Sequence, residues 1–124
     1  MASGQQTVEF SLKATSLTFT PGPAGSVIVQ ANWEGTATGL GATLGTATFV
    51  PAGMKSGTYS WCGVSYLDNG DSITDNAQGT IESSGRHKWR TQGIDHLSDG
   101  RVMRVEGEID LATRSWTGKL IEKS

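Results

Sequence analysis

The sequence is poor in several features that mark common classes of protein. Its 124 residues include one cysteine, Cys62, so an intrachain disulfide is excluded and a reducing compartment, the cytoplasm, is expected. Ten Lys and Arg against twelve Asp and Glu give a net charge of −2, which argues against nucleic acid as a partner. No run of about 18 apolar residues occurs, and the start lacks the apolar segment of a signal peptide, so no membrane partner is expected.

Long helical patterns are missing as well, whereas glycine is abundant. Only 35% of the residues are hydrophobic, and the 17 glycines are about twice the usual share. Short runs in which apolar and polar residues alternate are separated by Gly, Pro and Asn. This pattern predicts a single all-β domain over residues 7–124, preceded by a flexible lead-in over residues 1–6.

The alternating runs predict about eight strands at even spacing. Strands are expected at residues 8–20, 26–38, 42–50, 58–67 and 72–82, followed by three in succession between residues 88 and 123. The apolar phase shifts within the first run, which predicts a β-bulge near Thr15 and Ser16. Local connections favour an antiparallel up-and-down barrel, because the alternative, a two-sheet sandwich, needs a long crossing connection. An eight-stranded barrel is filled by side chains or encloses one small ligand.

Two glycine turns decide which side chains face the interior. Reading Asn69-Gly70 and Asp99-Gly100 as two-residue hairpin turns gives the register of four strands. Alternate side chains face opposite sides of a strand, and we expect the more apolar faces to be buried. The polar and reactive side chains that this register places in the interior are Cys62, Tyr66, Asp75, Arg90, Gln92 and His96.

A tryptophan repeat predicts different faces. Trp33, Trp61, Trp89 and Trp116 recur at nearly constant separation, and all but Trp89 are followed two residues later by Gly. Such a Gly leaves room beside an indole on the same face, unless the repeat is a coincidence in a glycine-rich chain. If the repeat sets the faces, Trp61 and Trp89 point inward. The interior would then also hold Tyr59, Asn76, Gln78, Asp95, Arg104, Glu106 and Glu108. We favour the apolar assignment, that is, the register in which the more apolar faces are buried, because burying several charges costs more free energy than their pairing returns.

The eight-strand meander, with a Gly/Thr-rich segment at residues 35–49, resembles the calycin-type barrels. It is most similar to the small bacterial barrels related to allene oxide cyclase. The resemblance rests on strand rhythm and composition over most of the chain, and it assigns no catalytic residue. It implies a lumen for a small hydrophobic molecule, assembly into homo-oligomers and, in some members, cyclase or isomerase activity.

These observations give one leading hypothesis and two alternatives. The leading one is a barrel that binds a small apolar molecule and isomerises, cyclises or rearranges it by acid–base chemistry, with His96, Asp75 and Tyr66 as candidate catalytic residues. The alternatives are a non-catalytic carrier or sensor, and an oligomerisation module whose barrel is filled. No Cys/His cluster has metal-ligand spacing, so neither a metal nor a cofactor is expected. The candidate ligand-binding residues are Trp33, Cys62, Arg90, Gln92, Met103 and Trp116.

Overall fold

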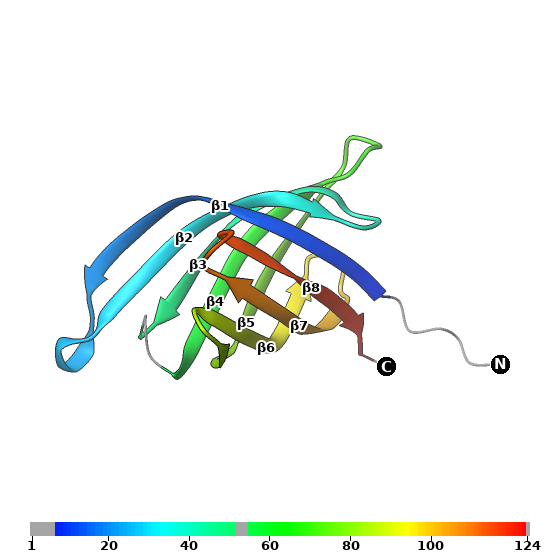
Figure 1. Cartoon of the computed structure of the whole chain (residues 1–124). Coiled ribbons are helices and arrows are strands. Elements are labelled where there is room, and N and C mark those ends of the chain that lie inside the picture. Colours follow the sequence, from blue (N-terminus) through cyan, green and yellow to red (C-terminus); the bar gives the residue numbers. More distant parts are fainter. Residues whose placement is uncertain (1–6, 52–54, 124) are drawn as a thin grey trace.

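The computed structural model is a closed barrel of eight antiparallel strands, described here over residues 7–51 and 55–123 (Figure 1). Each strand pairs with its neighbours in the sequence, and β1 pairs with β8 to close the barrel. The elements are β1 (Thr7–Pro21), η1 (Pro23–Gly25), β2 (Val27–Ala37), β3 (Gly41–Val50), β4 (Ser56–Tyr66), β5 (Ser72–Gly85), β6 (Lys88–Leu97), β7 (Val102–Asp110) and β8 (Ser115–Glu122). The predicted barrel is confirmed and the sandwich is wrong, while the predicted lead-in lies outside the described residues.

Strand β1 contains the predicted bulge. Its register on β2 shifts between Ala14 and Ser16, so Thr15 is the extra residue. Because of this extra residue, the inward-facing positions change from even to odd numbers, so that Leu17 lies on the same inner face as Leu12. Pairing with β8 ends at Lys13, and beyond it β1 and β2 run on together past the other strands (Figure 1). This extension carries apolar side chains to one end of the barrel.

The β4–β5 and β6–β7 hairpins have three-residue loops, not two-residue turns. In the loop at residues 98–100, the amide of Gly100 donates to the carbonyl of Leu97 at 3.0 Å. The amide of Leu97 in turn donates to the carbonyl of Arg101 at 3.0 Å. Gly100 has φ 97°, and Gly70 holds the same place in the other hairpin with φ 95°. The pattern matches a type I turn followed by a left-handed residue.

Because the loop has one more residue than predicted, one strand of each hairpin presents the opposite face to the interior. His96 pairs with Val102, and Asp95 takes the place opposite Met103 that a two-residue turn at Asp99-Gly100 would give to His96. Strands β5 and β7 keep their predicted faces, whereas β4 and β6 are reversed, since a one-residue slip exchanges the two faces of a strand. The prediction of an inward position was therefore wrong for Cys62, Tyr66, Arg90, Gln92 and His96.

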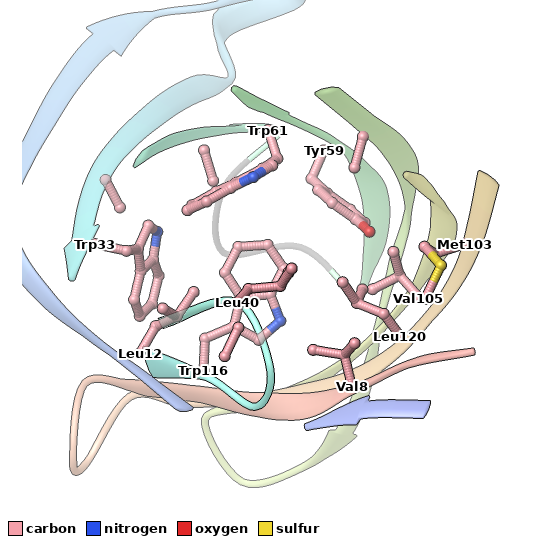
Figure 2. Packing of buried hydrophobic residues seen from close by; sticks show 14 of the residues in the cluster. Val8, Leu12, Trp33, Leu40, Tyr59, Trp61, Met103, Val105, Trp116 and Leu120 are labelled. Atoms are coloured by element: carbon pink, nitrogen blue, oxygen red, sulfur yellow. The ribbon is translucent and has the colours of Figure 1, made fainter. Parts of the chain in front are cut away.

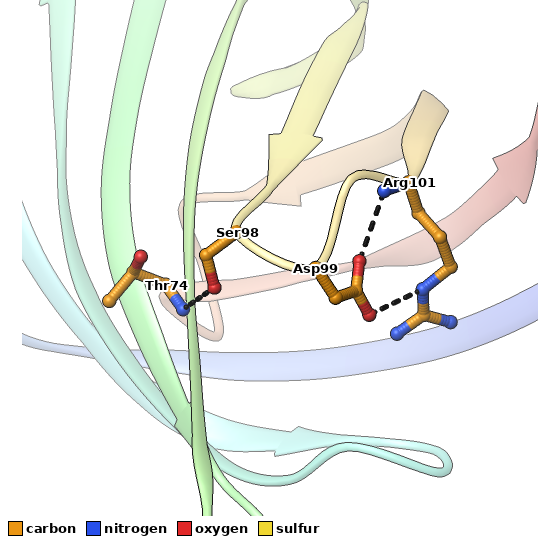
Figure 3. A network of polar contacts seen from close by, with 4 residues as sticks. All are labelled: Thr74, Ser98, Asp99 and Arg101. Atoms are coloured by element: carbon orange, nitrogen blue, oxygen red, sulfur yellow. Dashed lines mark hydrogen bonds and ion pairs between the residues drawn. The ribbon is translucent and has the colours of Figure 1, made fainter.

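Side-chain contacts hold the β6–β7 loop in this form (Figure 3). Asp99 accepts a hydrogen bond from the amide of Arg101 through Oδ1 at 3.0 Å, and its Oδ2 lies 2.9 Å from Arg101 Nε. Ser98 Oγ accepts from the amide of Thr74 at 3.0 Å. The loop is thus tied to β5 as well as to itself, which supports the observed register.

A cluster of aromatic rings fills the middle of the barrel (Figure 2). Trp116, from β8, is at its centre, and its indole Nε1 donates to the hydroxyl of Thr91 at 3.0 Å in the interior. Five other rings lie with centroids 5.4–6.0 Å from that of Trp116, mostly edge to face, an arrangement that favours aromatic pairs. They belong to Phe10, Trp33, Phe49, Tyr59 and Trp61.

The glycine beside a tryptophan has the predicted purpose in one of the three repeats. A Cβ on Gly63 or Gly45 would lie 2.5 Å from ring atoms of Trp61, so both positions must stay without a side chain for this indole to pack. Trp33, Trp61 and Trp116 are buried, and Trp89 is half-buried on the inner face. The hypothesis that the repeat marks inward residues is therefore confirmed for the tryptophans.

Replacing Gly100 by alanine tests the three-residue loop. We expect Gly100→Ala to lower the free energy of unfolding by about 1–2 kcal/mol, because a Cβ disfavours positive φ, while the site has open space around it. Gly100→Asn should cost less, since Asn tolerates this conformation better. Urea denaturation measures both, and an alanine variant as stable as the wild type would contradict the loop geometry.

Candidate functional site

The aromatic cluster divides the interior into two cavities, and none of the described residues lines both. The larger, which we name the cup, has a volume of about 470 Å³ and lies at the end where β1 and β2 extend. The smaller, which we name the chamber, has a volume of about 50 Å³ and lies toward the end that carries the β2–β3, β4–β5 and β6–β7 turns.

The cup is almost entirely apolar. Its floor is made by buried side chains, and its walls by half-buried and exposed ones, of which Phe19 is 63% exposed. Arg114 is the one charged side chain among the described residues around it. Its volume falls within the range typical of small-molecule sites, about 300–1,000 Å³. The lining residues are Ala14, Leu17, Phe19, Val27, Val29, Ala31, Trp33, Phe49, Ile81, Trp89, Ile109, Leu111 and Arg114.

The chamber holds a pair of carboxyl groups. Asp95, on β6, is 2% exposed, and the chamber that it lines is also lined by Asp75, on β5. The indole Nε1 of Trp61 donates to Asp75 Oδ2 at 3.0 Å. Burial, and then the hydrogen bond to Asp75 and its charge, raise the pKa of Asp95 to about 9. Asp95 is therefore a neutral acid at pH 7, and the second carboxyl group beside it contributes to this.

Two polar atoms of the chamber have no partner. Asp95 Oδ1 and the hydroxyl of Tyr59 are buried and make no hydrogen bond within the part of the chain that the structure describes. Burial, and then the charge of Asp95, raise the pKa of Tyr59. The hydroxyls of Thr43 and Ser65, which also line the chamber, bond to each other at 2.8 Å. A buried polar atom without a partner costs about 1–3 kcal/mol, so the two atoms indicate a place for a further molecule.

Asp75 is the one predicted catalytic residue that the structure places in the interior. Tyr66 is 54% exposed on the outer face of β4, and His96 is exposed on the outer face of β6. They are not brought together with Asp75 in either cavity. The predicted grouping of these three side chains was wrong, because the strands that carry Tyr66 and His96 are the two reversed ones.

The predicted ligand-binding residues are divided in the same way. Trp33 lines the cup and Trp116 lines the chamber. Met103 is fully buried opposite Asp95 but lines neither cavity. The remaining three point outward, and Arg90 lies 3.6 Å from Glu82 on the barrel surface. These outward residues are Cys62, Arg90 and Gln92.

The apolar assignment missed Asp95 and Tyr59, the two residues that define the chamber. The tryptophan repeat had placed both inside, and it was correct for β4 and β6. It was wrong for β5 and β7, whose polar side chains lie on the outer face. Those outward residues are Asn76, Gln78, Arg104, Glu106 and Glu108. A signal for the site was therefore present, but only on half of the strands concerned.

Comparisons of the chain with family models, curated proteins and solved structures give no match. Over residues 7–51 and 55–123, no group of three or more His, Cys, Asp or Glu side chains is placed to hold a metal ion. In the same ranges, no helix has the length and apolar character needed to cross a membrane. Function must therefore be inferred from the two cavities.

Asp95→Asn should change how stability depends on pH. The carboxyl of Asp95 keeps its proton up to about pH 9 in the folded chain and loses it near its ordinary pKa of 3.8 when unfolded. The unfolded state thus binds fewer protons between these values, and stability falls as the pH rises through this window. Asn resembles the neutral acid and cannot ionise. We expect the free energy of unfolding of Asp95→Asn at pH 8 to exceed that of the wild type by at least about 2 kcal/mol, since one pKa unit corresponds to about 1.4 kcal/mol.

Urea denaturation at pH 4, 6 and 8 measures this difference. Glu34→Gln serves as the control, because it removes an exposed carboxylate and should leave the pH profile of the wild type unchanged. If the stability of Asp95→Asn runs parallel to that of the wild type across this range, Asp95 is already ionised in the folded protein.

Proposed function

We propose that this protein binds a small apolar organic molecule in the cup and acts as a carrier or sensor of it. The observation that supports this best is the cup itself, an open cavity of about 470 Å³ whose described lining includes one charged side chain. Cavities of this size and character are typical of sites for small organic ligands. The proposal agrees with the lumen that a resemblance to calycin-type barrels implies.

Exposure of large apolar side chains around the cup supports a ligand. Leu17, Phe19, Val27 and Leu111 are each at least 39% exposed and gather on one cavity. Burying apolar surface is worth about 25 cal/mol per Å², so a ligand that covers these side chains gains free energy from each of them. Scattered exposed apolar residues need no explanation, but a contiguous group usually marks a binding surface.

A catalytic use of the cup has less support. Isomerisation or cyclisation by acid–base chemistry needs a proton donor or acceptor within hydrogen-bond reach of the ligand. The guanidinium of Arg114 has N–H donors and no acceptor, and the acid pair of Asp75 and Asp95 belongs to the chamber. A carrier or sensor requires no such group, and a cytoplasmic location remains part of the proposal.

Self-association is the competing explanation for the exposed apolar side chains. A second copy that covered Leu17, Phe19 and Val27 would occupy the same surface as the ligand. The two explanations differ in their dependence on protein concentration, because only self-association would close the cup as the concentration rises.

Filling the cup should abolish ligand binding. We expect the hydrophobic dye N-phenyl-1-naphthylamine to bind the wild type, and Ala14→Phe to weaken binding at least tenfold, because the ring occupies the cavity that Ala14 lines. Energy transfer from Trp33 and Trp89, which both line the cup, to the dye reports on occupancy. Thr18→Phe is the matched control, since it adds the same ring on the outer face of the same strand, opposite Gln30.

Two results would overturn the proposal. Equal dye affinities in Ala14→Phe and Thr18→Phe, with both variants folded, would place the dye outside the cup. Dye affinity that falls as the protein concentration rises, together with a larger mass in light scattering, would assign the apolar surface to self-association.

A further inference from the structure

The chamber combines two acids with the absence of a base. Asp75 and Asp95 both line it, and no Lys, Arg or His is among the described residues that do so. The titratable groups that face Asp95 are Asp75 from β5 and Tyr59 from β4. From β7, its partner across the strand pair is Met103, which is uncharged. Nothing in the described chain therefore neutralises the pair when both carboxyl groups are ionised.

The walls of the chamber are aromatic. Tyr59, Trp61 and Trp116 line it together with the two acids, and the rings of Tyr59 and Trp61 pack against that of Trp116 (Figure 2). Ring faces attract cations, and the attraction grows when the site is shielded from water. Aromatic rings around a carboxylate thus suit an organic cation better than a neutral polar group.

The unpartnered atoms match a donor of several hydrogen bonds. In its ionised form Asp95 only accepts, and its Oδ1 has no partner, while the unpartnered Tyr59 oxygen has free lone pairs as well as its proton. A primary ammonium group has three N–H donors and no acceptor. It could donate to Asp95 Oδ1, to the carboxylate of Asp75 and to the Tyr59 hydroxyl, leaving no buried acceptor unpaired.

We propose that the chamber is a second binding site, which takes the ammonium group of a small primary amine between Asp75, Asp95 and Tyr59. A volume of about 50 Å³ admits the head group and few further atoms. Leu40, carried inward by the β2–β3 turn, and Leu12 and Leu120 offer apolar contacts for a short carbon chain. The site does not depend on the proposed function of the cup.

Binding of an ammonium ion is linked to loss of a proton. The O–H bond of Asp95 breaks, its proton goes to solvent, and the ammonium group keeps all of its own protons. The site then holds two carboxylates and one cation. Since one proton leaves for each ligand bound, affinity should rise about tenfold per pH unit below the pKa of Asp95. An alkylammonium remains charged throughout this range, as a lysine side chain does.

Titration with methylammonium chloride tests the proposal. The NMR signal of the Trp61 indole N–H, which donates to Asp75, reports binding, and sodium chloride keeps the ionic strength constant. We expect saturable shifts whose Kd falls about tenfold for each unit between pH 6 and pH 8. Methanol, a neutral molecule of similar size, should bind at least tenfold more weakly at pH 8.

Variants separate the acid pair from the rest of the protein. Asp95→Asn keeps the shape of the neutral acid but cannot ionise, so it should weaken methylammonium binding at least tenfold and remove its pH dependence. Glu34→Gln, which removes an exposed carboxylate on the outer face of β2, should bind as the wild type does. Dye binding in the cup should be unchanged in both variants, which tells failure of this site from failure of the cup.

Three outcomes would overturn the inference. Methanol binding as tightly as methylammonium, with a Kd independent of pH, would make the chamber a site for neutral hydroxyl groups. An unchanged affinity in folded Asp95→Asn would place the cation elsewhere. Shifts that grow linearly with methylammonium and never saturate would leave the chamber without this ligand.

Discussion

The contact of Trp116 with the rings around it determines how the interior is divided. Its indole lies in the middle of the barrel, held by a hydrogen bond to Thr91 and by five aromatic neighbours. A buried aromatic side chain removes about 150–250 Å² from water, so this cluster is a large part of the core of so small a domain. Because the rings occupy the full centre, the apolar cup and the acidic chamber are separate sites.

The number of strands, their order and the bulge in β1 could be predicted because each rests on local alternation. The faces of β4 and β6 could not. An Asn-Gly or Asp-Gly pair supplies positive φ in a two-residue turn, but Gly also serves as the third residue of a longer loop. Gly70 and Gly100 are each the third residue of a three-residue loop. Asp75 was predicted correctly because β5 kept its face, whereas Asp95 replaced His96 when β6 reversed.

Counting apolar residues could not reveal the reversal of β4, because small residues lie beside the large rings on its inner face. The inner face of β4 carries two apolar residues, Tyr59 and Trp61, and its other inward positions are glycine and serine. Its outer face carries three apolar residues, Cys62, Val64 and Tyr66. On the inner face of β6, position 93 must be glycine, because a Cβ there would lie 2.7 Å from the hydroxyl oxygen of Tyr59. A strand that faces large rings needs small residues, so its buried face can hold fewer apolar residues than its exposed face.

Each half of the barrel keeps a feature that folding alone does not favour. At one end, Phe19 and its neighbours leave apolar surface in water. At the other, a carboxyl group is buried beside a second one and without a base among the described lining residues. Replacing such buried polar groups by apolar residues of similar volume is often neutral or stabilising, so their presence is not explained by stability. Strongly shifted ionisable groups in a cavity instead favour a functional site. Since one cavity offers apolar contact and the other negative charge, separated by Trp116, the molecules they suit must differ in chemistry.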